Sequence, residues 1–83
     1  MKKEIKLEIK DNNGLHARKC LEICKAAQSF KSDLALIHNN IRIDVKSILG
    51  LLSLACTKGE IVTLEATGDD ASNAIDLLSS LVC

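Results

Sequence analysis

The chain has 83 residues, and we expect a single domain spanning residues 1–83. Its 11 basic residues balance 11 acidic ones, and Phe30 is the only Phe, Trp or Tyr side chain. The even charge balance and the single aromatic ring argue against nucleic-acid binding, because that function relies on basic patches and base stacking. No apolar run approaches the roughly 20 residues of a membrane span, and the N-terminal residues are unlike a signal peptide, so we expect a cytoplasmic protein without membrane insertion.

The N-terminal third combines a strand with a helix. Charged and apolar residues alternate over residues 2–10, which is typical of a strand buried on one face, and apolar residues at helical spacing predict a helix over residues 17–30. The connecting Gly14-Leu15-His16-Ala17-Arg18 places His16 at the positive end of this helix, where free backbone N–H groups attract anions. An imidazole there can accept a phosphoryl group, and Arg18 can help to neutralise its charge. This pattern indicates phosphoryl transfer through histidine.

A hairpin follows in the middle of the chain. Two short strands are predicted over residues 33–37 and 41–45, on either side of Asn39-Asn40. Asparagine pairs of this kind suit the positive φ angles of a tight turn. His38, beside the turn, is expected to be solvated.

The second helix, over residues 46–56, carries more apolar residues than one buried face needs. Ser47 is a plausible N-cap, and Gly59 can end the region in a left-handed conformation. A small sheet has little room to surround a helix, so we expect some of these apolar side chains to be exposed and to form a docking patch. The residues concerned are Ile48, Leu49, Leu51, Leu52, Leu54 and Ala55.

The C-terminal part predicts a fourth strand over residues 60–67 and a last helix after the turn at Gly68-Asp69-Asp70. Strands buried on one face call for an antiparallel sheet with the helices on one side, a two-layer α+β domain. A ferredoxin-like fold shares the first six elements, so the element order alone leaves the topology open.

Four cysteines raise the question of disulfides and metal sites. A reducing compartment keeps thiols free, and small hydrophobic fillers are the simplest reading of Cys20, Cys24, Cys56 and Cys83. His16, Cys20 and Cys24 are spaced four and four on one helical face, which suggests a metal carrier as an alternative. No fourth ligand of the right type lies nearby in the sequence, so we expect no metal.

These features resemble the HPr family, the histidine-containing phosphocarrier proteins of the bacterial sugar phosphotransferase system. The resemblance covers essentially the whole chain. It rests on the Gly14–Arg18 motif, on Lys46-Ser47-Ile48-Leu49-Gly50 with Leu52-Ser53-Leu54 behind it, and on the order of the seven elements. It implies an open-faced sandwich, with a four-stranded antiparallel sheet in the order 1-4-2-3 and three helices on one face.

The resemblance also implies roles for particular residues. His16 would accept a phosphoryl group on Nδ1 from enzyme I and pass it to sugar-specific A domains, while Arg18 stabilises the phosphoryl oxygens. Ser47 matches a serine that an HPr kinase/phosphorylase modifies in some bacteria. The apolar docking surface would comprise Ile48, Leu49 and Leu52, with Lys19 beside it. The protein would be a monomeric carrier and not an enzyme, without a cofactor.

Lys19 departs from the family pattern, because proline usually follows the arginine of the motif. Proline would preset the first helical turn, whereas lysine adds a flexible charge and loosens the loop. This departure leaves open a regulatory or nitrogen-related phosphocarrier with weakened transfer, or a binding module that does not need His16.

Overall fold

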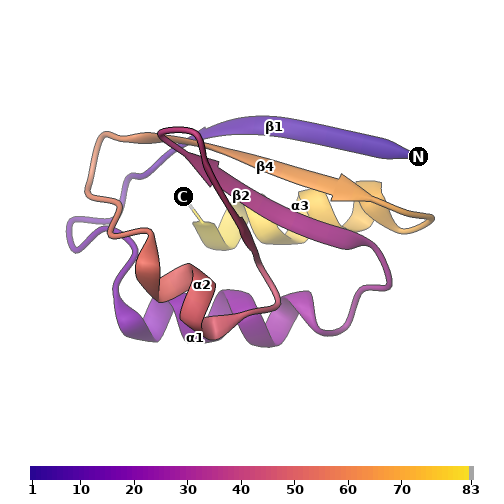
Figure 1. Cartoon of the computed structure of the whole chain (residues 1–83), viewed down its shortest axis with the longest axis horizontal. Coiled ribbons are helices and arrows are strands. Elements are labelled where there is room, and N and C mark those ends of the chain that lie inside the picture. Colours follow the sequence, from indigo (N-terminus) through magenta and orange to yellow (C-terminus); the bar gives the residue numbers. More distant parts are fainter. Residues whose placement is uncertain (83) are drawn as a thin grey trace.

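A computed structural model describes residues 1–82 and contains seven elements in the order that the sequence predicts (Figure 1). They are β1 (Lys2–Glu8), α1 (Ala17–Ala27), β2 (Asp33–His38), β3 (Ile41–Asp44), α2 (Ile48–Ser53), β4 (Ile61–Thr67) and α3 (Ala71–Val82). None of the helices within residues 1–82 is long and apolar enough to span a membrane.

The strands form one antiparallel sheet in the order β1-β4-β2-β3, as the family resemblance implies. All three helices lie on the same side of this sheet, and the other face is open (Figure 1). This confirms the predicted α+β open-faced sandwich and rules out the ferredoxin-like strand order as the alternative.

The core lies between the sheet and the helices. Each strand turns alternate residues toward the helices, because side chains of a strand point to opposite faces. The fully buried side chains with the largest volumes are aliphatic and come from both layers: Ile9, Ile23, Leu36, Leu51, Leu64 and Leu78.

The turn between β2 and β3 confirms the predicted asparagine pair, with φ angles of 50° at Asn39 and 68° at Asn40. The expectation that His38 is solvated is wrong, since this residue is only 8% exposed. His38 shares the alternation of Leu34 and Leu36, which turns its side chain toward the covered face of the sheet. Its Nε2 lies 2.9 Å from Oε1 of Glu60.

Two helices are shorter than predicted. The backbone N–H groups of Ser29 and Phe30 reach back only three residues, to Ala26 and Ala27, so α1 closes in a tight final turn. Helix α2 begins after Ser47 and ends where Ala55 adopts a left-handed conformation, with a φ of 48°. Gly59 also has a positive φ, but it lies in the turn before β4.

Candidate functional site

His16 is the N-cap residue of α1, with an extended backbone at φ −82° and ψ 169°. Its carbonyl accepts the first helical hydrogen bond, from the N–H of Cys20 at 3.0 Å. Within residues 1–82 the imidazole makes no capping bond to the helix, and its side chain is 34% exposed. The ring is therefore reachable at the helix end where unpaired N–H groups favour anions.

Arg18 lies exposed in the first turn of α1, two residues after His16. None of the ion pairs formed within residues 1–82 involves its guanidinium. A guanidinium presents several N–H donors in a fixed plane, which suits the oxygens of a phosphoryl group. Arg18 is thus available to an anion at His16.

Asp11 is a charged group at this site that the sequence analysis missed. Its Oδ2 lies 3.7 Å from Nε2 of His16 and 3.5 Å from Nζ of Lys19. The N–H of Asn13 donates to Oδ1 at 2.9 Å and lowers the pKa of Asp11, and the charge of Lys19 acts in the same direction while partial burial opposes both. No periodic pattern marks a loop carboxylate, so only its place five residues before His16 could have drawn attention to it.

Lys19, which stands where the family usually has proline, was expected to add a flexible charge, but the structure shows its side chain held in place. Its side chain is only 19% exposed, and its ammonium group is held by Asp11. The positive charge beside His16 is therefore paired with a negative one.

The loop that carries His16 rests on the segment after α2. Gly14 has a φ of 65°, and a Cβ atom there would lie 2.3 Å from the carbonyl oxygen of Cys56. The N–H of Leu15 donates to the same oxygen at 3.0 Å. Only glycine permits this close approach, so the first residue of the motif serves packing rather than chemistry.

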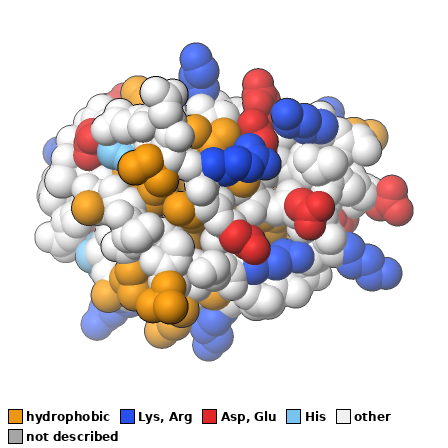
Figure 2. Space-filling view, in the orientation of Figure 1, with side chains coloured by type: hydrophobic (Ala, Val, Ile, Leu, Met, Phe, Trp, Pro, Cys, Tyr) orange, Lys and Arg blue, Asp and Glu red, His pale blue; other side chains and the backbone are white. Residues whose placement is uncertain are grey.

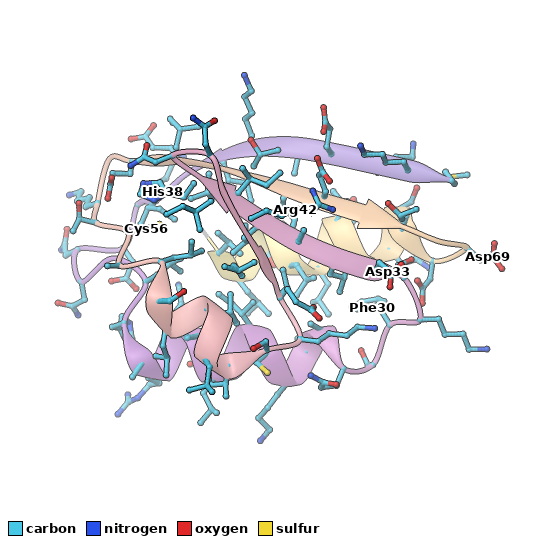
Figure 3. The ribbon with its side chains drawn as sticks, viewed as in Figure 1. Phe30, Asp33, His38, Arg42, Cys56 and Asp69 are labelled. Carbon is cyan, nitrogen blue, oxygen red and sulfur yellow. The ribbon has the colours of Figure 1, made fainter. Side chains whose placement is uncertain are left out.

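Glu60 secures that segment from the other side. Its Oε2 accepts hydrogen bonds from the N–H of Thr57 at 2.5 Å and from Oγ1 of the same residue at 2.9 Å. These bonds lower the pKa of Glu60, and the contact with His38 adds to the effect. Figure 3 shows His38 and Cys56 at one end of the molecule and Asp69 at the other. The sequence analysis missed this network, because His38 and Glu60 are 22 residues apart.

Helix α2 confirms the predicted N-cap at Ser47 and the predicted exposure of some of its apolar side chains. The side chain of Ser47 caps the helix by accepting the N–H of Gly50 at 3.1 Å. Leu49 is 78% exposed and Leu52 is 45% exposed, whereas Leu51 is fully buried and Ile48 is half-buried against the core. Hydrophobic side chains gather over this helix in Figure 2.

The cysteines behave as packing residues. Cys20 and Cys56 are buried, and burial raises the pKa of both thiols, that of Cys56 to about 11. Cys24 is half-buried and donates to the carbonyl of Lys46 at 3.3 Å. Residues 1–82 contain no group of three or more side chains arranged to hold a metal ion, and Cys83 lies outside the described residues.

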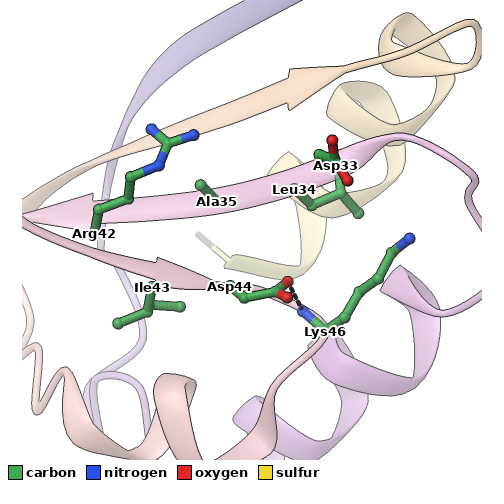
Figure 4. A pocket seen from close by; sticks show the side chains of 7 residues that line it. All are labelled: Asp33, Leu34, Ala35, Arg42, Ile43, Asp44 and Lys46. Carbon is green, nitrogen blue, oxygen red and sulfur yellow. Dashed lines mark hydrogen bonds between the residues drawn. The ribbon is translucent and has the colours of Figure 1, made fainter.

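A separate hollow of about 330 Å³ lies beside β2 and β3 (Figure 4). Three of its four charged side chains are engaged. Arg42 donates to Glu65 at 2.5 Å, Lys46 donates through Nζ to the carbonyl of Phe30 at 2.8 Å, and Asp44 accepts the N–H of Lys46 at 2.9 Å. The fourth, Asp33, has no side-chain hydrogen bond or ion pair within residues 1–82.

Comparison with known proteins agrees with this geometry. The family described as "PTS HPr component phosphorylation site" matches residues 3–83. A phosphocarrier protein HPr from Neisseria meningitidis serogroup A is 38% identical over 76 residues, which is 92% of this chain and 85% of that protein.

Solved structures share the fold. HPr-C-His from Thermoanaerobacter tengcongensis superposes with a TM-score of 0.91 at 39% identity, covering 96% of this chain and 90% of that one. HPr from Bacillus anthracis superposes with a TM-score of 0.94 at 28% identity, covering 99% and 98%. With the family match over nearly all of its length, this chain belongs to the HPr family and is a non-catalytic phosphocarrier of the phosphotransferase system of sugar transport.

Proposed function

We propose that His16 accepts a phosphoryl group on Nδ1 from phosphorylated enzyme I and passes it to sugar-specific A domains in the cytoplasm. The observation that carries this proposal is the position of His16 as the partly exposed N-cap of α1, with Arg18 unpaired within the described residues beside it. The N–H groups of the first helical turn and the guanidinium can both receive the charge that arrives.

The transfer needs no cofactor. The lone pair of Nδ1 forms the new N–P bond while the bond between phosphorus and the donor nitrogen of enzyme I breaks, and its electron pair stays with the donor. Donation to an A domain reverses these roles. A phosphoryl carrier must hold the group only moderately, and one arginine at a helix end meets that need better than a deep pocket.

The docking surface of this proposal comprises Ile48, Leu49 and Leu52 on α2, with Lys19 at its border. Leu49 and Leu52 are the apolar side chains of α2 that are exposed, and Ile48 extends the patch toward the core. Burial of such side chains against a partner is favourable, because it removes apolar surface from water.

Ser47 is the proposed regulatory position, as a substrate of an HPr kinase/phosphorylase. The residue is exposed and directly precedes Ile48, the first residue of the docking surface. A phosphate there adds negative charge at a helix start, which the fold tolerates, and it would repel acidic partner surfaces.

The experiment combines the protein with phosphoenolpyruvate and enzyme I and analyses the product for acid-labile, base-stable phosphate. We expect one phosphohistidine, at His16, and none in the His16→Ala variant with its fold intact. Phosphate recovered on His38, or unchanged transfer by His16→Ala, would contradict the proposal.

A further inference from the structure

The carboxylate of Asp11 faces one particular nitrogen of the His16 ring. Oδ2 lies 3.7 Å from Nε2, the ring nitrogen farther from the backbone. The Asn13 N–H holds the other carboxylate oxygen at 2.9 Å, which fixes the direction of the carboxylate. Contacts of this length at a reactive group tighten into hydrogen bonds when a partner closes over the site.

We propose that Asp11 is a positioning residue for phosphoryl transfer, which keeps the ring proton of His16 on Nε2 and leaves the lone pair on Nδ1. This inference rests on the proposed function of His16. A neutral imidazole carries one N–H, and a carboxylate favours the tautomer whose N–H points toward it. The nitrogen that remains unprotonated is then Nδ1.

The same carboxylate acts during the transfer itself. When Nδ1 forms its bond to phosphorus, the ring retains the proton on Nε2 and becomes positively charged. Asp11 stabilises this charge, which is absent from the neutral ring before the transfer, so the interaction lowers the barrier and does not merely tighten binding. When the group leaves for an A domain, the N–P electron pair returns to Nδ1. The ring proton remains on Nε2 through the whole cycle.

Lys19 completes the arrangement. A lone carboxylate beside His16 would repel the incoming phosphoryl group, but the ammonium of Lys19 lies 3.5 Å from the oxygen that faces His16. The pair adds no net charge to the site while leaving Asp11 directed at Nε2. In this view Lys19 balances the charge of Asp11, and Asp11 alone selects the tautomer of His16.

The test measures the tautomer of His16 by ¹⁵N NMR with the imidazole neutral, together with single-turnover acceptance from phosphorylated enzyme I. Asp11→Asn removes the charge and retains an acceptor for the Asn13 N–H. Asp69→Asn is the control of equal charge change, since Asp69 is exposed at the opposite end of the molecule (Figure 3). Lys19→Gln tests whether Asp11 acts only by holding the lysine. Signals of His38 are assigned from the His16→Ala variant.

In the wild type we expect the Nε2–H tautomer to predominate. Asp11→Asn should shift the population toward Nδ1–H and slow acceptance about fivefold at unchanged KM, the effect of a partly exposed ion pair. Lys19→Gln should leave the tautomer population of His16 as it is, and Asp69→Asn should change neither measurement.

A predominant Nδ1–H tautomer in the wild type would overturn the inference without any variant. An unchanged tautomer and rate in Asp11→Asn would do the same, and so would an equal tautomer shift in Lys19→Gln. If wild-type protein accepts no phosphoryl group at all, the proposed function fails, whereas the NMR result still decides whether Asp11 selects the tautomer.

Discussion

Replacement of Leu49 by aspartate should weaken binding to enzyme I with little loss of stability. Full burial of a leucine side chain contributes about 1.5–3 kcal/mol, and 78% of Leu49 is available for burial by a partner. The lost contact is then about 1.2–2.3 kcal/mol, or roughly an 8- to 50-fold higher Kd. The same reasoning for Leu52, which is 45% exposed, gives about 1 kcal/mol and roughly a fivefold effect.

The cost to the fold should be small, because Leu49 is the second residue of α2 and a negative charge near a helix start is favourable. We expect a change in the free energy of unfolding within about 0.5 kcal/mol. Leu51→Ala provides the opposite case, since Leu51 is fully buried and its truncation should cost about 2–5 kcal/mol.

The assay pairs calorimetric Kd values for enzyme I with thermal unfolding of each variant. Leu77→Asp on α3 is the matched control, because Leu77 has the same 45% exposure as Leu52 on a different helix. The reasoning is refuted if Leu49→Asp unfolds as Leu51→Ala does, if its Kd equals that of the wild type, or if Leu77→Asp weakens binding as much as Leu52→Asp.

Four further outcomes are expected. Arg18→Ala should slow transfer while phosphohistidine remains detectable by acid-labile phosphate analysis, because arginine stabilises charge and is not the acceptor; equal single-turnover rates would contradict this role. Folding lowers the pKa of Glu60, so its stabilising contribution is complete above the ordinary glutamate pKa of about 4.3 and is lost as the pH falls through the lower value of the folded state. Glu60→Gln should therefore lower Tm at neutral pH and flatten its decline in acid; parallel Tm curves would show that the contact with Thr57 contributes nothing. Ala55→Gly should raise Tm by about 2–4 °C, because relief of about 1–2 kcal/mol of left-handed strain exceeds the added entropy of the unfolded chain; a lower Tm would mean that the strain is absent. Gly14→Ala should destabilise the protein and slow phosphoryl acceptance, since its Cβ would collide with the backbone of Cys56, and wild-type values for both would be incompatible with that contact.

The order of the elements and the hairpin could be predicted because local patterns encode them. Alternation of charged and apolar residues predicts β1, and Asn39-Asn40 adopts the positive φ angles that a tight turn requires. The exposure of leucines on α2 could be predicted because this helix has more apolar residues than its one buried face can cover. Strand order came from the family resemblance and not from periodicity.

Interactions between distant residues could not be read from local patterns. The contact of His38 in β2 with Glu60, the residue before β4, spans the segment that contains β3 and α2, and no local pattern predicts it. Asp11 was close to His16 in sequence, but its direction depends on a hydrogen bond from Asn13 within an irregular loop. The early end of α2 depends on the left-handed backbone of Ala55, a conformation that alanine disfavours.

The pairing of β1 with β4 has a consequence for how the protein forms. Within residues 1–82, residues 2–8 pair with residues 61–67 alone, more than fifty residues later in the chain, so one edge of the sheet is completed by a contact between residues far apart in sequence. The loop carrying His16 follows β1 and donates a hydrogen bond, through the N–H of Leu15, to the carbonyl of Cys56, which lies between α2 and β4. During synthesis from the N-terminus, the histidine emerges long before the residues that hold it in place. Competence to carry a phosphoryl group should thus arise abruptly, when the last third of the chain folds against the first.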